Sequence, residues 1–297
     1  MTLIRQPKRQ HLVSQVVLRQ FARRGVLTLY DGARQAFITK GPRSGFYMSF
    51  DQHDPVGAEE LWKKTEDHIP KMYAALEART ASGDPGVEAL VRDVLALHWA
   101  RSGAMREAHE RVMEQVMRRS IEDVARDPDL LAREMLRSKG LIATSSAALD
   151  WFNEDIHNRV VAQNRDKWLS DRNAHHLAEA QRIMRPWSVQ IGYAPAGSDL
   201  IISDAPVVTV KSGHDGVGPH QGVALGDASE ICMPLTPTVL VALGPEPRML
   251  DLTPESVDRY NDLQIRARIR WLGCRPSGSS DKALRAMFPG RGRPQPT

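Results

Sequence analysis

Cysteines, aromatic residues and long apolar runs are scarce in this chain of 297 residues. Its two cysteines, Cys232 and Cys274, lie in different segments and match no metal-binding spacing, so we expect free buried thiols. No apolar run approaches the roughly 20 residues that span a bilayer, and the N-terminal segment lacks the apolar core of a secretory signal. These absences predict a cytoplasmic protein without a membrane partner.

Motifs for nucleotide and metal binding are also missing. The glycines of the loop 211–222 lie outside the strand and helix context that a phosphate-binding loop requires. There is no His-Glu-x-x-His motif, and the single pair Glu154 and His157 lacks the second copy that a di-iron bundle uses. The sequence therefore predicts no bound metal and no cofactor.

Basic residues are concentrated at the two ends of the chain. Residues 1–50 hold nine Lys or Arg against one acidic residue, and residues 264–297 hold eight against one. If these ends meet in the fold, their charge would attract a nucleic acid or a phosphorylated ligand. The alternative to such a binding role is that the high arginine content reflects the coding bias of a GC-rich genome.

The order of helical and strand patterns predicts an α+β fold in which a helical half packs on a mainly antiparallel sheet. We expect a single domain over residues 1–276 and a flexible basic tail over residues 277–297. Within the domain we expect a helix-rich segment 58–184, a strand-rich segment 185–245 and a terminal helix 254–272.

Near the N-terminus, apolar positions at helical offsets predict a helix over residues 10–22, with His11 in its first turn and Gln15 on the same face. A hairpin follows, because Asp31-Gly32 is suited to a tight turn between the strand patterns of residues 26–30 and 36–39.

A second hairpin is expected around the turn at residues 196–198. Residues 187–191 alternate apolar and polar side chains, and the apolar run 200–202 reads as the returning strand. Asp204 then follows that strand, either as a turn former or as a site residue held on a rigid scaffold.

Several separated segments resemble the bacterial family called domain of unknown function 4238, which has no established activity. RQHLVSQVVLRQFA is similar to the opening signature of that family, LIISDAPVV to its strand and turn, and MPLTPTVLVAL to its strand pair. The acidic helix that contains Glu66 and the helix that contains Asn261 also resemble family elements. The resemblance covers most of residues 8–272 and implies a set of polar positions to test: His11, Gln15, Glu66, Ser203, Asp204 and Asn261.

From these residues we expect a hydrolase that acts on a nucleic-acid or other phosphate-bearing substrate, with His11 and Asp204 as its acid–base pair. Glu66 and Asn261 complete the expected catalytic set. The expected substrate-binding residues are Gln15, Ser203, Arg19 and Arg268. A metal-dependent variant that uses His11, Glu66 and Asp204 ranks lower, because no ligand spacing supports it. The alternative of another class is a non-catalytic recognition or regulatory module in which the same polar residues form a structural network. The sequence leaves the oligomeric state open.

Overall fold

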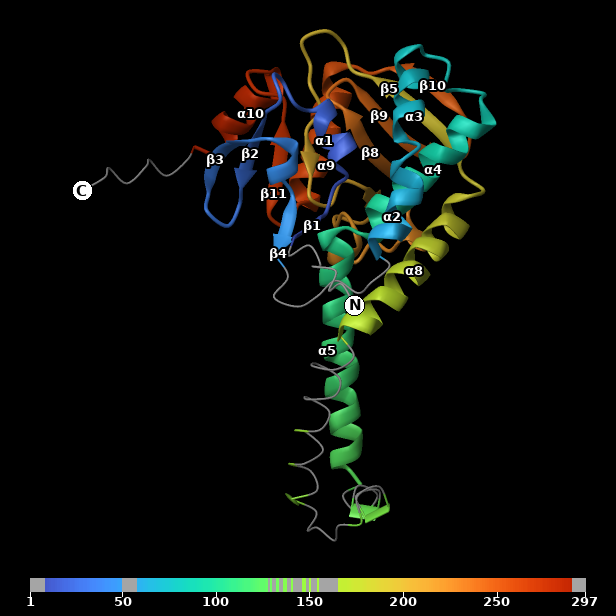
Figure 1. Cartoon of the computed structure of the whole chain (residues 1–297), viewed down its shortest axis with the longest axis vertical. Helices are drawn as coiled ribbons and strands as arrows, with labels where there is room; N and C mark the ends of the chain where they lie inside the picture. The colour runs from blue at the N-terminus through green and yellow to red at the C-terminus, as the bar shows by residue number, and fades with distance from the viewer. Residues whose placement is uncertain are drawn as a thin grey trace, which may run out of the picture.

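The computed structural model describes residues 9–49, 58–127 and 165–289, together with scattered residues between 128 and 164. It confirms the α+β class, with helices packed against mostly antiparallel sheets (Figure 1).

The helices are α1 (Gln15–Gln20), α2 (Ala58–Glu66), α3 (Ile69–Glu77), α4 (Pro85–Ala100), α5 (Gly103–Ala125), α8 (Arg165–Met184), α9 (Pro254–Ala267) and α10 (Ser279–Met287). The strands are β1 (Arg9–His11), β2 (Leu27–Asp31), β3 (Ala36–Lys40), β4 (Tyr47–Ser49), β5 (Ser188–Tyr193), β6 (Ile202–Ser203), β7 (Val208–Val210), β8 (Glu230–Thr236), β9 (Val239–Gly244), β10 (Arg248–Asp251) and β11 (Trp271–Cys274).

The larger sheet has five strands in the order β10-β5-β9-β8-β7. All its pairs are antiparallel except β10 with β5, which run parallel. Side chains alternate between its two faces because the period of a strand is two residues. On β9, Val241 points to the main core, whereas Leu240 and Ala242 point to a second cluster beneath α9.

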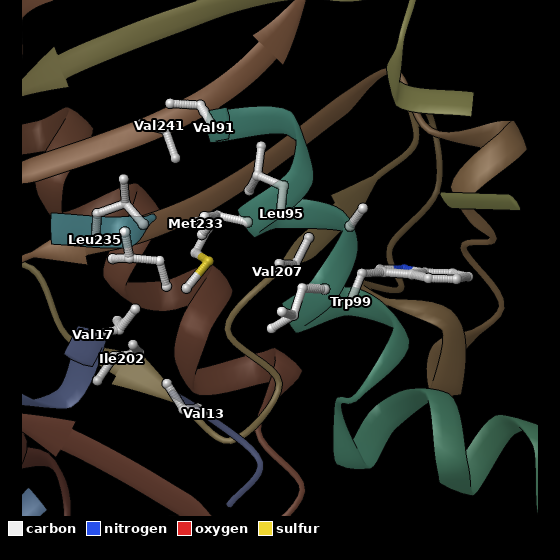
Figure 2. Close-up of a cluster of buried hydrophobic side chains, with 14 of the residues drawn as sticks. Val13, Val17, Val91, Leu95, Trp99, Ile202, Val207, Met233, Leu235 and Val241 are labelled. Atoms are coloured by element: carbon white, nitrogen blue, oxygen red, sulfur yellow. The ribbon is translucent and has the colours of Figure 1, made fainter. Parts of the chain in front are cut away.

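The main core lies between the five-stranded sheet and the helices α1, α3, α4 and α8. Figure 2 shows Val91 and Leu95 of α4 directed towards Met233, Leu235 and Val241 of the sheet. Each of these five side chains is fully buried, and burying such a side chain stabilises the fold by roughly 1.5–3 kcal/mol before entropy is counted. Helix α4 is therefore the central helix of the fold.

Helix α4 begins where its sequence contains standard start signals. The Asp84 carboxylate accepts hydrogen bonds from the backbone N–H groups of Gly86 (2.8 Å) and Val87 (3.1 Å), and Pro85 occupies the first turn. These contacts satisfy donors that have no partner inside the helix. After Ala100 the chain turns into α5, which extends away from the body of the molecule (Figure 1).

The smaller sheet has the order β3-β2-β11-β6 and joins the two ends of the chain. The hairpin predicted around Asp31-Gly32 is confirmed as β2 and β3, but Asp31 is the last residue of β2 and the connecting loop covers residues 32–35. Strand β11, from the C-terminal part, pairs antiparallel with β2. The pairing is reinforced by a bidentate ion pair, in which the Arg270 guanidinium donates to both oxygens of the buried Asp31 carboxylate at 2.9 and 2.8 Å.

The hairpin expected from residues 187–191 and 200–202 was wrong. Strand β5 pairs with β9 and β10 in the larger sheet, whereas β6 pairs with β11 in the smaller one. Alternation correctly indicated that both segments are extended, but the pairing of a strand depends on tertiary neighbours that the local pattern does not encode.

The N-terminal helix is shorter than predicted. Residues 9–11 form strand β1, which pairs with β4, so His11 ends a strand and does not lie in a helical turn. Helix α1 begins only at Gln15, and Ser14 occupies its N-cap position. Competition from the β1–β4 pairing overrides the helical spacing of the first residues.

Two C-terminal boundaries also differ from the predictions. The expected helix 254–272 ends at Ala267, because Arg268 adopts an extended conformation and the chain then enters β11. The expected flexible tail 277–297 contains helix α10, whose Leu284 is buried. Residues 290–297 lie outside the described residues, as do most of residues 128–164 and His157.

Two further expectations concern the thiols and the membrane. Cys232 and Cys274 are free and buried, as predicted. Within the described residues, no helix combines the length and the apolar character that crossing a membrane requires.

Candidate functional site

The ends of β1 and α2 place polar side chains around the start of α1. His11 is the last residue of β1, Gln15 is the first residue of α1, and Glu66 is the last residue of α2. Each of these residues lies at the end of a strand or helix. Their polar side chains therefore do not interrupt the apolar faces by which those elements pack. We call His11, Ser14, Gln15, Glu66, His98 and Arg101 the α1 cluster.

The hydrogen bonds of His11 define its tautomer. Nδ1 lies 3.3 Å from the Gly45 carbonyl oxygen, which can only accept, so Nδ1 carries the proton. Nε2 then accepts a hydrogen bond from the Gln15 amide at 3.0 Å. The sequence predicted that these two side chains would be neighbours, and they are in contact although His11 is not helical.

Two effects keep the half-buried His11 imidazole neutral. Burial and the positive charge of Arg101 lower the pKa of His11, and they outweigh the Gly45 hydrogen bond and the charge of Glu66, which raise it. At neutral pH the ring is therefore uncharged, with its basic lone pair on Nε2.

Glu66 is held as a carboxylate. Its Oε1 accepts hydrogen bonds from the Ser14 hydroxyl (2.5 Å) and from the Arg101 guanidinium (2.7 Å). Burial alone would raise the pKa of Glu66, but the charge of Arg101 and these two bonds outweigh it and lower the pKa. Its Oε2 makes no hydrogen bond with another described residue, and 26% of the side chain is exposed.

Arg101 is the buried cation of the α1 cluster. Only 5% of its side chain is exposed, and its Nε has no hydrogen-bond partner in the described part of the chain. Since removing a guanidinium from water is costly, its ion pair with Glu66 is needed to compensate for burial. The buried guanidinium lies close enough to His11 for its charge to lower the pKa of that imidazole.

His98 has a structural position in the same cluster. It is fully buried on α4, its Nδ1–H donates to the Val94 carbonyl at 2.8 Å, and its Nε2 accepts from the Ser14 backbone N–H at 3.2 Å. Burial, assisted by the charge of Arg101, lowers the pKa of His98 to about 4. The neutral ring thus joins the N-terminus of α1 to α4.

A separate network contains Ser203 and Asp204. Asp204 is almost completely buried, and its carboxylate accepts hydrogen bonds from the backbone N–H groups of Ile269 and Arg270, both at 2.9 Å. Burial raises the pKa of Asp204 to about 6, against the lowering effect of these bonds. The Ser203 hydroxyl and backbone N–H both donate to Gln264 of α9. Together these bonds fasten β6 to the end of α9 and the start of β11.

The remaining predicted site residues lie apart from His11. The Asn261 carboxamide accepts from the Ile201 N–H (2.9 Å) and donates to the Asp199 carbonyl (3.0 Å), so it fixes the segment before β6. Arg19 is exposed near the end of α1, and Arg268 packs its guanidinium over the Phe288 ring, 5.1 Å from the centroid.

The structure therefore brings together three of the predicted residues: His11, Gln15 and Glu66. Among the described residues, no hydrogen bond or ion pair joins His11 to Asp204, because each is satisfied by other partners. The expected His11–Asp204 pair does not form. In the described ranges, no group of three or more His, Cys, Asp or Glu side chains has the geometry of a metal site.

A family model described as "Protein of unknown function (DUF4238)" matches residues 9–272. The chain belongs to this family. No curated protein and no solved structure matches the chain. Both the α1 cluster and the Asp204 network lie inside the matched DUF4238 region, whereas α10 lies beyond it.

Three residues of the α1 cluster in this DUF4238 protein were not predicted as site residues from the sequence: Ser14, His98 and Arg101. His98 and Arg101 come at the end of the apolar helix α4, in the segment LALHWAR. A buried helix seldom contains such polar residues unless they are paired, and this was the signal that could have identified them.

Proposed function

We propose that this protein is a hydrolase acting on a nucleic-acid or other phosphate-bearing substrate, with His11 as the general base. The observation that carries the proposal is the neutral, half-buried imidazole of His11 beside the ionised Glu66 carboxylate. A general base must be unprotonated at the working pH and must be able to reach solvent, and the half-buried His11 meets both requirements. In the part of the chain that the structure describes, Asp204 and Asn261 bond to residues outside the α1 cluster, so they have no part in the proposed chemistry.

The proposed step begins when a water molecule replaces the Gln15 amide at Nε2 of His11. The water oxygen attacks the phosphorus while its proton passes to Nε2, and the P–O bond to the leaving group breaks. The imidazolium then returns the proton to the leaving oxygen. Glu66 stabilises the transient imidazolium by its charge.

The arrangement of the basic chain ends supports a phosphate-bearing substrate. Strand β11 joins the N-terminal hairpin β2–β3, and α10 packs beside them (Figure 1). Among the described residues, Arg24, Lys40 and Arg43 in this region form no ion pair, so their charges are not neutralised locally. Such a surface attracts polyanions.

The test compares wild type with His11→Ala and with His68→Ala, an exposed histidine whose side chain bonds to no described residue. Hydrolysis of bis(p-nitrophenyl) phosphate and of single-stranded RNA is measured. His11→Ala should lose roughly 10²- to 10⁴-fold in kcat/KM, the usual contribution of a general base, while His68→Ala remains like wild type. The wild-type rate should fall as the pH drops below the lowered pKa of His11.

Glu66→Gln separates catalysis from structural support. The amide keeps an oxygen for Ser14 and Arg101 but removes the charge that raises the pKa of His11, so the acidic limb of the pH profile should move to lower pH. Hydrolysis that is absent in wild type, or unaffected in His11→Ala, would reject the proposal. In that case an intact fold with retained RNA binding would favour the recognition module.

A further inference from the structure

An open cavity of about 690 Å³ lies at the opposite end of α1 from His11. Its lining comes from three parts of the chain: the segment after α1, the turn between β5 and β6, and the start of α10. The volume falls within the range of small-molecule sites, which is roughly 300–1,000 Å³.

Cations outnumber carboxylates around this cavity. Arg23, Arg275 and Lys282 line it, together with the single carboxylate of Asp199. Arg275 lies 3.5 Å from that carboxylate. Arg23 and Lys282 are exposed and form no ion pair with any described residue, so the cavity has a surplus of positive charge.

Asp199 serves as a structural anchor here, and its single negative charge is paired with Arg275. Its carboxylate accepts from the Ser279 N–H (3.1 Å), and its own N–H donates to the Ser279 hydroxyl (2.9 Å). Gly278 leaves space for this contact, since a side chain there would collide with the Asp199 carboxylate. The hydrogen bond from Asn261 to the Asp199 carbonyl holds the same segment from the other side.

Arg23 is presented by a tight turn. Its backbone N–H donates to the Val26 carbonyl at 2.8 Å, and the Val26 N–H donates back at 3.2 Å. Between them Arg24 and Gly25 have φ angles of 53° and 78°, as the two central residues of a type I′ turn require. The backbone at Arg23 is therefore fixed relative to the cavity.

We propose that this cavity binds the phosphate group of a small phosphorylated ligand. Two unpaired cations match the charge of a phosphate dianion, and the guanidinium of Arg23 can donate two parallel hydrogen bonds to its oxygens. The proposal is independent of the hydrolase chemistry, since no residue of the α1 cluster lines the cavity. Arg275 and Lys282 also lie beyond the DUF4238 match, so this site belongs partly to the C-terminal segment of this chain.

Isothermal titration calorimetry with inorganic pyrophosphate tests the proposal on the full chain. Wild type should bind one equivalent with a dissociation constant in the millimolar range or below. Arg23→Gln and Lys282→Gln should each weaken binding roughly three- to fivefold, and the double variant should show no saturable binding. Lys71→Gln is the matched control, because Lys71 is an exposed helical lysine that does not line the cavity.

Three results would overturn the proposal: no binding by wild type, unchanged binding by the double variant, or an equal loss in Lys71→Gln, which would indicate attraction by net charge alone. Thermal unfolding without pyrophosphate checks that each variant is folded. Pyrophosphate should raise the Tm of wild type but not of the double variant. His11→Ala should still bind pyrophosphate, so failure of the proposed hydrolase and failure of this site are distinguishable.

Discussion

At the scale of single residues, His98 and Asp204 show how burial acts on opposite charge types. Burial lowers the pKa of His98 to about 4 and raises the pKa of Asp204 to about 6. In both cases the charged form is disfavoured. His98 therefore contributes stability above its unfolded pKa that is lost on acidification, whereas Asp204 contributes stability at low pH that is lost as the pH rises towards 6.

His98→Gln is predicted to remove the part of the pH dependence that comes from His98. The Gln side chain can still accept from the Ser14 N–H but does not titrate. As the pH falls from about 6.5 towards 4, the free energy of unfolding of wild type should therefore decrease relative to that of the variant. Urea unfolding at several pH values in this window measures the difference. His68→Gln, an exposed substitution, should follow wild type, and parallel curves for wild type and His98→Gln would contradict the assignment.

Only some members of the α1 cluster could be predicted from the sequence. His11, Gln15 and Glu66 stand out in segments that resemble a family, so they could be named from the sequence. Arg101 and His98 acquire their roles from partners 35 and 84 residues away along the chain. No local pattern encodes a separation of that kind.

At the scale of elements, α10 is the clearest departure from expectation. Its Gly- and Ser-rich flanks indicated a mobile tail, yet Leu284 packs in a cluster with Tyr30, Leu272 and Cys274 on the smaller sheet. The buried Asp281 carboxylate also accepts from the Ser277 N–H at 2.8 Å and from Arg285 at 2.7 Å. Helix α10 is thus part of the folded domain.

Leu284→Ala is predicted to destabilise the protein by about 2–4 kcal/mol, the usual cost of a cavity left by a buried leucine. Met287→Ala, on the same helix but 55% exposed, should change the free energy of unfolding by less than about 0.5 kcal/mol. Urea or thermal unfolding of both variants makes the comparison. Equal, small effects would mean that α10 does not pack on the smaller sheet in solution.

At the scale of the whole molecule, the two basic ends lie side by side because β11 pairs with β2. Several of their arginines are engaged in ion pairs, among them Arg270 with Asp31 and Arg285 with Asp281. The cations without such pairs carry the proposed attraction for nucleic acid. Because that attraction depends on counterion release, it should respond strongly to salt.

Filter binding of single-stranded RNA at two salt concentrations tests this surface. The affinity of wild type should fall steeply as salt is added. The double variant Lys40→Gln with Arg43→Gln should have a shallower slope of log K against log salt, by about 0.7 for each RNA phosphate that the protein no longer neutralises. Lys63→Gln, an exposed charge on α2, is the control and should leave the slope unchanged. No binding at low salt would remove nucleic acid as a partner.

Local signals were sufficient for elements whose structure depends on neighbours in the chain. The strand patterns on either side of Gly32 formed the expected β2–β3 hairpin, although its loop covers residues 32–35 and the positive φ lies at Gln35. Thr253 caps the start of α9 through the Ser256 N–H at 3.2 Å. The position where α9 ends depends on a contact that is distant in sequence. The backbone N–H groups of Ile269 and Arg270 donate to the Asp204 carboxylate, and the chain then continues into strand β11.

The sequence by itself determined the α+β class, the free thiols and the positions of strands such as β2, β3 and β5, because periodicity and composition act over short stretches of chain. Only the tertiary structure decided which strands pair, that His11 bonds to Gly45 and Gln15 within range of the Glu66 charge and not to Asp204, and that Arg23 and Lys282 line one cavity. Strand pairing and side-chain partners depend on long-range packing. Several pairings are compatible with the same local sequence, and the one that forms is the one that buries apolar side chains and satisfies buried hydrogen-bonding groups.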